Sequence, residues 1–245
     1  AAVDAQLRPQ QPMTSRMMHL NLFVFGCGHH RGAWRHPHSG ETGPETLSLA
    51  AQRAGLEAQL SDHVQRRALT AAAQWPSKLA RLRLSINVNA SDVARAGFAD
   101  SLLGRVDASG FPRSRLTVEI TESGIMADLT EAARLLSQLR AAGCRVAIDD
   151  FGTGYSSLAY LKALPLDYLK IDKRLSHDIT GAHRDRVVVR GVIDMARSLG
   201  LAVVAEGVET EAQLDLLAKE GCQYFQGYLC AEPLDVPALA NLVQG

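Results

Sequence analysis

The sequence predicts an α/β protein with a (β/α)8 barrel, and three observations favour this fold. The chain has 245 residues, which is a normal length for one barrel domain. From Leu82 onward, short runs rich in β-branched residues alternate with longer amphipathic stretches, as expected for repeated strand–helix units around a parallel sheet. Polar residues follow the predicted strands, and the carboxyl ends of barrel strands meet at one mouth.

The predicted strands are short, and the stretches between them carry apolar residues at three- and four-residue spacing. Strands are expected at residues 82–88, 116–121, 145–149, 168–171 and 202–206 and near Tyr224. Helices are expected at residues 90–106, 129–142, 184–199 and 210–220. Gly143 and Gly200 follow two of these helices, where a left-handed residue ends a helix before the next strand.

The N-terminal part brings the predicted strands to eight. Residues 20–25 and 31–34 are predicted as strands, and residues 45–54 and 60–74 as helices. Residues 1–18 are predicted to be a tail or linker, so the barrel domain is expected to cover residues 19–245. Glycines and four histidines crowd residues 26–43, where the second strand should begin.

Composition argues against several classes of function. Basic and acidic residues balance at 26 each, so the chain has no overall attraction for polymeric nucleic acid. No apolar run is long enough to cross a bilayer, and we expect no membrane contact by this domain. Four cysteines at scattered spacing indicate reduced thiols in a cytoplasmic domain. The chain opens without methionine or a signal peptide, which suggests part of a longer protein that can itself be membrane-attached.

Polar side chains at the ends of six successive predicted strands are the first functional signal. They are Asn87, Glu119 with Glu122, Asp149 with Asp150, Lys170 with Asp172, Glu206 with Glu209, and Gln226. Each by itself can be a turn residue or a surface charge. Together they indicate a cation site, because clustered buried carboxylates repel one another unless cations neutralise them. Such oxygen ligands suit Mg²⁺ or Mn²⁺ rather than zinc.

The most specific stretch is the run of residues 149–158, Asp-Asp-Phe-Gly-Thr-Gly-Tyr-Ser-Ser-Leu. Two adjacent acids cannot both point inward from a regular strand, so a bend is predicted after Asp149. Gly152 and Gly154 would permit this bend. An ordinary acidic loop before a helix has a similar composition, and the glycine spacing matches neither the dinucleotide pattern nor the P-loop pattern.

This run, together with four further motifs, resembles the EAL family of cyclic di-GMP phosphodiesterases. The further motifs are Glu119-Ile120-Thr121-Glu122, Lys170-Ile171-Asp172, Ala205-Glu206-Gly207-Val208-Glu209 and Gln226-Gly227-Tyr228. The likeness starts near Trp34, includes Arg35-His36-Pro37 and reaches the C-terminus. It implies a modified barrel with an atypical first strand, which hydrolyses cyclic di-GMP to linear pGpG with two Mg²⁺ or Mn²⁺ ions in bacterial second-messenger signalling.

The resemblance also implies a role for each polar strand end. The metal ligands would be Asn87, Glu119, Asp149, Asp150 and Glu206. Lys170 would hold or deprotonate the attacking water, and Gln226 would support that water. Glu122 would anchor the loop after Asp149, while Asp172 and Glu209 would lie behind the ligands or contact cyclic di-GMP. Members of the family often form homodimers through a face near the loop after Asp150, so a homodimer is expected.

The sequence departs from the family at its founding motif. The metal-binding Glu of the Glu-Ala-Leu run is replaced by His29, and the Arg that contacts the ligand is replaced by Ala33, with Arg31 nearby as a partial substitute. Three explanations compete. In the first, the domain has lost catalysis and kept binding of cyclic di-GMP; in the second, His29 acts as a metal ligand; in the third, this segment differs from the native sequence. Impaired turnover is the direct expectation, since imidazole suits Mg²⁺ poorly and Mn²⁺ tolerably.

Two other functions compete with metal-dependent hydrolysis of cyclic di-GMP. The first is a receptor that binds the dinucleotide and signals through an attached domain or a dimer partner. The second is an unrelated Mg²⁺-dependent barrel enzyme that acts on a sugar phosphate. The histidines near residue 30 could also form a separate transition-metal site with Cys27, although a solvated loop is the simpler interpretation.

Overall fold

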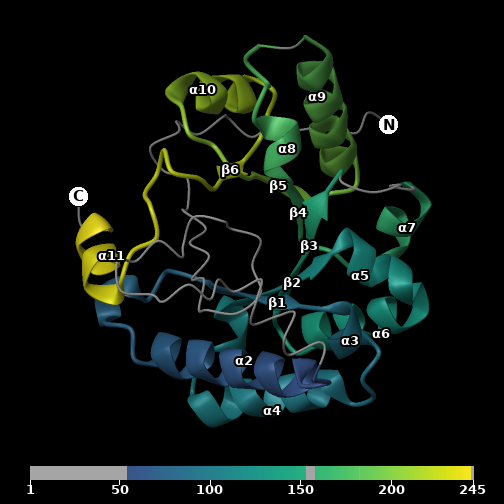
Figure 1. The fold of residues 1–245 in the computed structure, drawn as a ribbon, viewed down its shortest axis with the longest axis vertical. Helices are drawn as coiled ribbons and strands as arrows, with labels where there is room; N and C mark the ends of the chain where they lie inside the picture. Colours follow the sequence, from purple (N-terminus) through teal and green to yellow (C-terminus); the bar gives the residue numbers. More distant parts are fainter. Residues whose placement is uncertain (1–53, 153–157, 182, 244–245) are drawn as a thin grey trace, which may run out of the picture.

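A single parallel sheet organises the described residues of the computed structural model, which are 54–152, 158–181 and 183–243. Its six strands follow one another in chain order around an arc, with helices on the outer side (Figure 1). The strands are β1 (Leu84–Val88), β2 (Leu116–Thr121), β3 (Arg145–Phe151), β4 (Tyr168–Ile171), β5 (Ala202–Ala205) and β6 (Tyr224–Phe225). Repeated parallel strands joined by helices are the architecture of a modified (β/α)8 barrel, as predicted.

Helices connect the successive strands, precede the first and follow the last, and they cover the outside of the arc. They are α2 (Glu57–Ala73), α3 (Ala90–Val93), α4 (Phe98–Ser109), α5 (Glu122–Ala127), α6 (Leu129–Ala141), α7 (Leu158–Ala163), α8 (Lys173–Ser176), α9 (His183–Ser198), α10 (Glu211–Lys219) and α11 (Val236–Leu242). Short 3-10 turns occupy Ser77–Leu79 and Arg113–Arg115. All six strands predicted from residue 82 onward are present, with boundaries that differ by two residues or fewer where the prediction gave them.

The C-terminal helix packs on the segment that lies between α2 and β1. Leu239 and Ala240 of α11 pack against Leu79 and Leu82, which lie just before β1. Figure 1 shows α11 close to the segment that follows the end of α2. The segment that follows β6 and the segment that precedes β1 are therefore linked by apolar packing outside the sheet.

One helix prediction was wrong. Residues 90–106 were expected to form one helix, but the structure has α3 and α4 with a break between them. Gly97 takes a left-handed conformation with φ of 72° immediately before α4. Apolar residues keep a three- to four-residue spacing on both sides of the break, so periodicity did not reveal the turn.

Two helix ends follow the predicted cap chemistry. Gly143 and Gly200 have φ values of 93° and 74°, so both residues are left-handed. After Gly143, the amide of Cys144 donates to the carbonyl of Leu139, and after Gly200 the amide of Leu201 donates to the carbonyl of Ala196. These bonds satisfy carbonyls in the last turn of each helix and direct the chain into the next strand.

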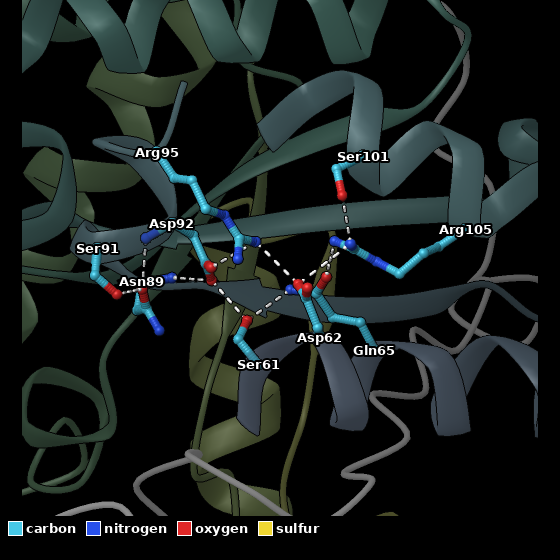
Figure 2. Close-up of polar contacts among 9 residues, drawn as sticks. All are labelled: Ser61, Asp62, Gln65, Asn89, Ser91, Asp92, Arg95, Ser101 and Arg105. Atoms are coloured by element: carbon cyan, nitrogen blue, oxygen red, sulfur yellow. Dashed lines mark hydrogen bonds and ion pairs between the residues drawn. The ribbon is translucent and has the colours of Figure 1, made fainter. Parts of the chain in front are cut away.

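A polar network joins α2, α3 and α4 behind β1 (Figure 2). Arg105 is buried, donates to Gln65 at 2.6 Å and lies 3.2 Å from Asp62. Asp92 is also buried, accepts from Ser61 at 2.7 Å and forms a capping box with Asn89 at the start of α3. Burial of a charge is unfavourable without partners, and the partners of Arg105 and Asp92 lie on neighbouring helices. The network therefore holds these helices together at the end of β1.

Several predictions concern residues outside the described ranges. They include the strands at 20–25 and 31–34, most of the helix at 45–54, and the roles of His29 and Arg31. Within the described residues, none of the helices combines the length and the apolar character needed to span a membrane.

Candidate metal-binding and catalytic site

Lys170 lies at the centre of a buried cluster of acids at the carboxyl end of the sheet. Its Nζ atom is 2.7 Å from Glu119 Oε2, 2.9 Å from Asp149 Oδ1 and 2.7 Å from Glu206 Oε1. These residues come from β2, β3 and β4 and from the position directly after β5. Residues distant in sequence thus meet because the parallel strands end at the same level.

Electrostatics in the cluster are dominated by burial and by an excess of negative charge. Burial raises the pKa of Glu206 to about 7, and the neighbouring acids reinforce this shift although Lys170 opposes it. Burial and Asp149 likewise raise the pKa of Glu119. For Lys170 burial alone lowers the pKa, but the three carboxylates outweigh burial and hold the pKa well above its ordinary value. One ammonium facing three acids leaves a site that would accept further positive charge.

The predicted bend lies at Asp150. This residue is left-handed, with φ of 54°, and the register between β3 and β4 shifts between Ile148 and Phe151. The amide of Asp150 donates to Asp149 Oδ1 at 3.0 Å. Sequence reasoning assigned the bend to the glycines; Gly152 is left-handed, with φ of 96°, but Asp150 itself leaves the regular strand. An aspartate tolerates this conformation better than most residues.

The bend gathers three carboxylates within reach of one cation. Oxygens of Asp149, Asp150 and Glu206 all lie within 4.8 Å of one another. This donor set contains oxygen only, which fits Mg²⁺, Mn²⁺ or Ca²⁺ and fits Zn²⁺ poorly. Glu119 adds a further acid to the site, with its Oε2 atom 2.7 Å from the Nζ atom of Lys170.

Glu122 connects the site to the loop after β3. It is the first residue of α5 and is buried. Its Oε2 accepts from the amide of Gly152 at 3.3 Å, and its Oε1 accepts from the hydroxyl of Tyr160 at 3.0 Å. Sequence reasoning named Glu122 but missed Tyr160, whose buried position on α7 has no motif of its own.

Asp172 forms the N-cap of α8 and faces Arg174. It accepts from the Arg174 amide at 2.7 Å and from Arg174 Nε at 2.9 Å. Burial raises the pKa of Asp172, but the bonds to Arg174 and a side-chain bond with Asp150 outweigh burial and lower it overall. Asp172 thus lies next to Asp150 without being among the acids that pair with Lys170.

The remaining predicted residues are not among the groups that pair with Lys170. Asn87 is exposed and pairs in register with Glu119 on the neighbouring strand. Gln226 lines a small cavity with Glu119 and Lys170. Glu209 is exposed, and its backbone amide donates to Gln213 Oε1 at 2.8 Å. The predicted ligand contact by Arg31 lies outside the described residues.

Comparisons with known proteins converge on one family. Residues 31–233 match the family model described as the EAL domain. The chain is 41% identical over 212 residues to the cyclic di-GMP phosphodiesterase NbdA of Pseudomonas aeruginosa, covering 86% of this chain and 27% of that protein. It is 38% identical over 201 residues to the cyclic di-GMP phosphodiesterase PA2567 of the same organism, covering 82% of this chain and 34% of that protein. The chain therefore spans about a quarter to a third of these relatives.

Solved structures give the same result. The PaMucR phosphodiesterase in complex with c-di-GMP superposes with a TM-score of 0.77 at 37% identity, covering 84% of each chain. Klebsiella pneumoniae BlrP1 in a manganese and cyclic di-GMP complex superposes with a TM-score of 0.69 at 31% identity, covering 76% of this chain and 47% of that one.

Proposed function

The chain belongs to the EAL domain family, and from this premise we propose that it is a metal-dependent phosphodiesterase that hydrolyses cyclic di-GMP to linear pGpG. The observation that carries the proposal is the position of Lys170 within 2.9 Å of Glu119, Asp149 and Glu206. A buried amine among acids at the mouth of a barrel is suited to bind cations and an anionic substrate together.

The metal ligands in this proposal are Asn87, Glu119, Asp149, Asp150 and Glu206. Two Mg²⁺ or Mn²⁺ ions, when bound, would supply positive charge that stabilises the phosphate oxygens and lowers the pKa of water. Asp149, Asp150 and Glu206 already have oxygens within 4.8 Å of one another. The acidic cluster therefore needs little rearrangement to accept cations.

Lys170 is proposed to hold, and when neutral to deprotonate, the attacking water. The three carboxylates keep it cationic in the absence of metal. Positive charge near these acids would weaken their hold on Lys170 and shift it toward the neutral amine. Gln226, which lines the same cavity, would hold the water or its neighbours by its amide group. Both groups line the same cavity.

The loop after β3 is proposed to be held in place by Glu122 through the amide of Gly152. Asp172 would support Asp150 from behind, and Glu209 and Arg31 would contribute around the ligand. These assignments follow the family motifs, and the contacts of Glu122 and Asp172 are compatible with them.

A receptor that binds cyclic di-GMP without cleaving it is the second candidate, because we expect His29 to occupy the position where the family has a metal-binding Glu. Calorimetry with cyclic di-GMP and chromatography for pGpG, both with Mn²⁺, separate the two. Product formation that Asp149→Asn abolishes supports hydrolysis. Tight binding without product identifies a receptor, and no binding at all points to another substrate, such as a sugar phosphate.

The motif position gives a second test. If His29 occupies the place of the missing ligand, His29→Glu should increase both Mn²⁺ affinity and turnover, since a carboxylate binds Mn²⁺ and Mg²⁺ better than imidazole does. Unchanged kcat and unchanged Mn²⁺ affinity in His29→Glu would contradict this alignment. Ala33→Arg, which restores the other family residue, is a matched control because it should change KM for cyclic di-GMP without changing metal affinity.

We also propose that the domain covers residues 19–245, works in the cytoplasm and forms a homodimer. Val187 and Val188 on α9 are 54% and 42% exposed, and such apolar side chains are suited to a protein contact. Light scattering should give the mass of a dimer. If α9 lies in the dimer interface, Val188→Asp should lower the measured mass. A monomeric mass for the unmodified chain would contradict the proposed dimer.

A further inference from the structure

The turn that carries Glu206 lies against α8. Glu206 follows β5, and its carboxylate is 2.7 Å from Lys170 Nζ. Gly207 is left-handed, with φ of 65°, and a Cβ atom there would lie 2.5 Å from the Cβ atom of Lys173. The backbone of the turn is therefore packed directly on α8, with no space for a side chain between them.

Ser176 provides a hydrogen bond between α8 and this turn. It is the last residue of α8 and is 1% exposed. Its hydroxyl donates to the backbone carbonyl of Glu206, with a longer alternative to the Lys173 carbonyl at 3.3 Å. On the other side, the Glu206 amide donates to the Ile171 carbonyl at 3.0 Å. The peptide groups on both sides of the Glu206 Cα atom are thus fixed, which limits where the carboxylate can point.

Gln213 fixes the far end of the same turn. Its Oε1 accepts from the amides of Glu209 at 2.8 Å and Thr210 at 3.0 Å. Its Nε2 donates at 3.0 Å to the carbonyl of His177, the residue after Ser176. Both ends of the turn are therefore bound to one short segment, residues 176–177.

The same segment is coupled to Lys170. Asp172 caps α8 and lies only two residues after Lys170 in the chain. Helix α8 thus connects the end of β4, which carries Lys170, with the turn that carries Glu206. A loss of contact between α8 and the turn would change the geometry between the amine and the acid.

We propose that Ser176 is a positioning residue, whose hydroxyl orients Glu206 toward Lys170 and the metal-binding acids by holding the Glu206 carbonyl. Its effect on turnover rests on the proposed phosphodiesterase function. Its effect on the turn itself and on cation binding does not, because both are measurable without substrate.

The test compares Ser176→Ala and Ser176→Cys with the unmodified chain. Alanine removes the donor, whereas cysteine keeps the volume but offers only a weak S–H donor. In metal-free protein, hydrogen exchange of the amides at residues 208–210 should become faster by about fivefold in Ser176→Ala, the size expected for one lost hydrogen bond. The dissociation constant for Mn²⁺ should rise by about fivefold in calorimetry, and kcat should fall while KM stays constant.

Ser198→Ala is the matched control. Its hydroxyl also donates to a backbone carbonyl, that of Asp194 at 2.8 Å, but it is exposed on α9. It should leave exchange, Mn²⁺ affinity and kcat unchanged. Ser176→Cys should resemble Ser176→Ala, because the defect lies in the bond and not in the volume.

Unchanged exchange and Mn²⁺ affinity in Ser176→Ala would overturn the proposal, and so would a Ser176→Cys protein equal to the unmodified chain. A global loss of exchange protection in Ser176→Ala, extending to β1 and β2, would also overturn it, since Ser176 would then support the whole fold. If the unmodified chain produces no pGpG, the phosphodiesterase function fails, while exchange and Mn²⁺ binding still decide the role of Ser176.

Discussion

Replacement of Lys170 by methionine tests the charge balance of the acidic cluster. The variant keeps a long apolar stem and removes the ammonium that lies within 2.9 Å of three carboxylates. Lys170 and Glu119 have only 4% and 3% of their side chains exposed, so water cannot compensate for the loss. Breaking a buried ion pair typically costs about 3–5 kcal/mol, and we expect a loss of this size at pH 8 without metal.

The loss should be smaller in acid. Burial has already raised the pKa of Glu206 to about 7, and removal of Lys170 takes away the group that opposes this shift. The Glu206 carboxyl has a higher pKa in the folded state than in the unfolded state, where it is near 4.5. Its protonation therefore stabilises the fold fully below pH 4.5, and this stabilisation is lost as the pH rises through the folded-state pKa. At pH 5 the acids of the variant can be neutralised by protons in place of the missing ammonium. About half of the loss in unfolding free energy seen at pH 8 should therefore remain.

Urea unfolding at pH 5 and pH 8, with a metal chelator in the buffer, measures the loss of unfolding free energy at each pH. Lys162→Met, an exposed lysine on α7, is the control and should be nearly neutral at both pH values. Added Mn²⁺ should stabilise Lys170→Met more than the unmodified chain, because the ammonium no longer competes for the same acids. An equal loss of stability at both pH values would refute the reasoning, because Lys170 would then act by packing alone.

Three further predictions concern single contacts. Tyr160→Phe removes the donor to Glu122 and should destabilise the fold by about 1–2 kcal/mol in urea unfolding; a neutral effect would show that water replaces the hydroxyl. Arg105→Met breaks the network behind β1 and should lower the unfolding free energy by about 2 kcal/mol while the affinity for Mn²⁺ stays the same. Weaker Mn²⁺ binding in calorimetry would contradict this prediction. Gly207→Ala forces a methyl group against Lys173 and should cost about 1–3 kcal/mol and weaken Mn²⁺ binding, and a melting temperature equal to that of the unmodified chain would count against the packing described.

Local patterns in the sequence predicted the six strands and the longer helices after residue 82, but they did not predict the short helices α5, α7, α8 and α11. Short β-branched runs and amphipathic stretches set each element through neighbours a few residues away, so all six strands after residue 82 were found. The break at Gly97 was missed because the apolar spacing on its two sides is compatible with one helix. A parallel barrel brings its strand ends together, which is why Glu119, Asp149 and Lys170 could be grouped from their positions in the chain.

Contacts within the site depended on the tertiary structure. The left-handed Asp150, the bond from Tyr160 to Glu122 and the bond from Ser176 to Glu206 follow no local pattern. The last two bonds join residues 38 and 30 positions apart, so their geometry depends on how several strands and helices pack at once. Strand periodicity is a local property, and together with the expected parallel order it predicted that Glu119, Asp149, Lys170 and Glu206 come together. Which of these groups touch one another was not predictable in this way, because hydrogen bonds a few ångströms long are set by the packing of elements distant in the chain.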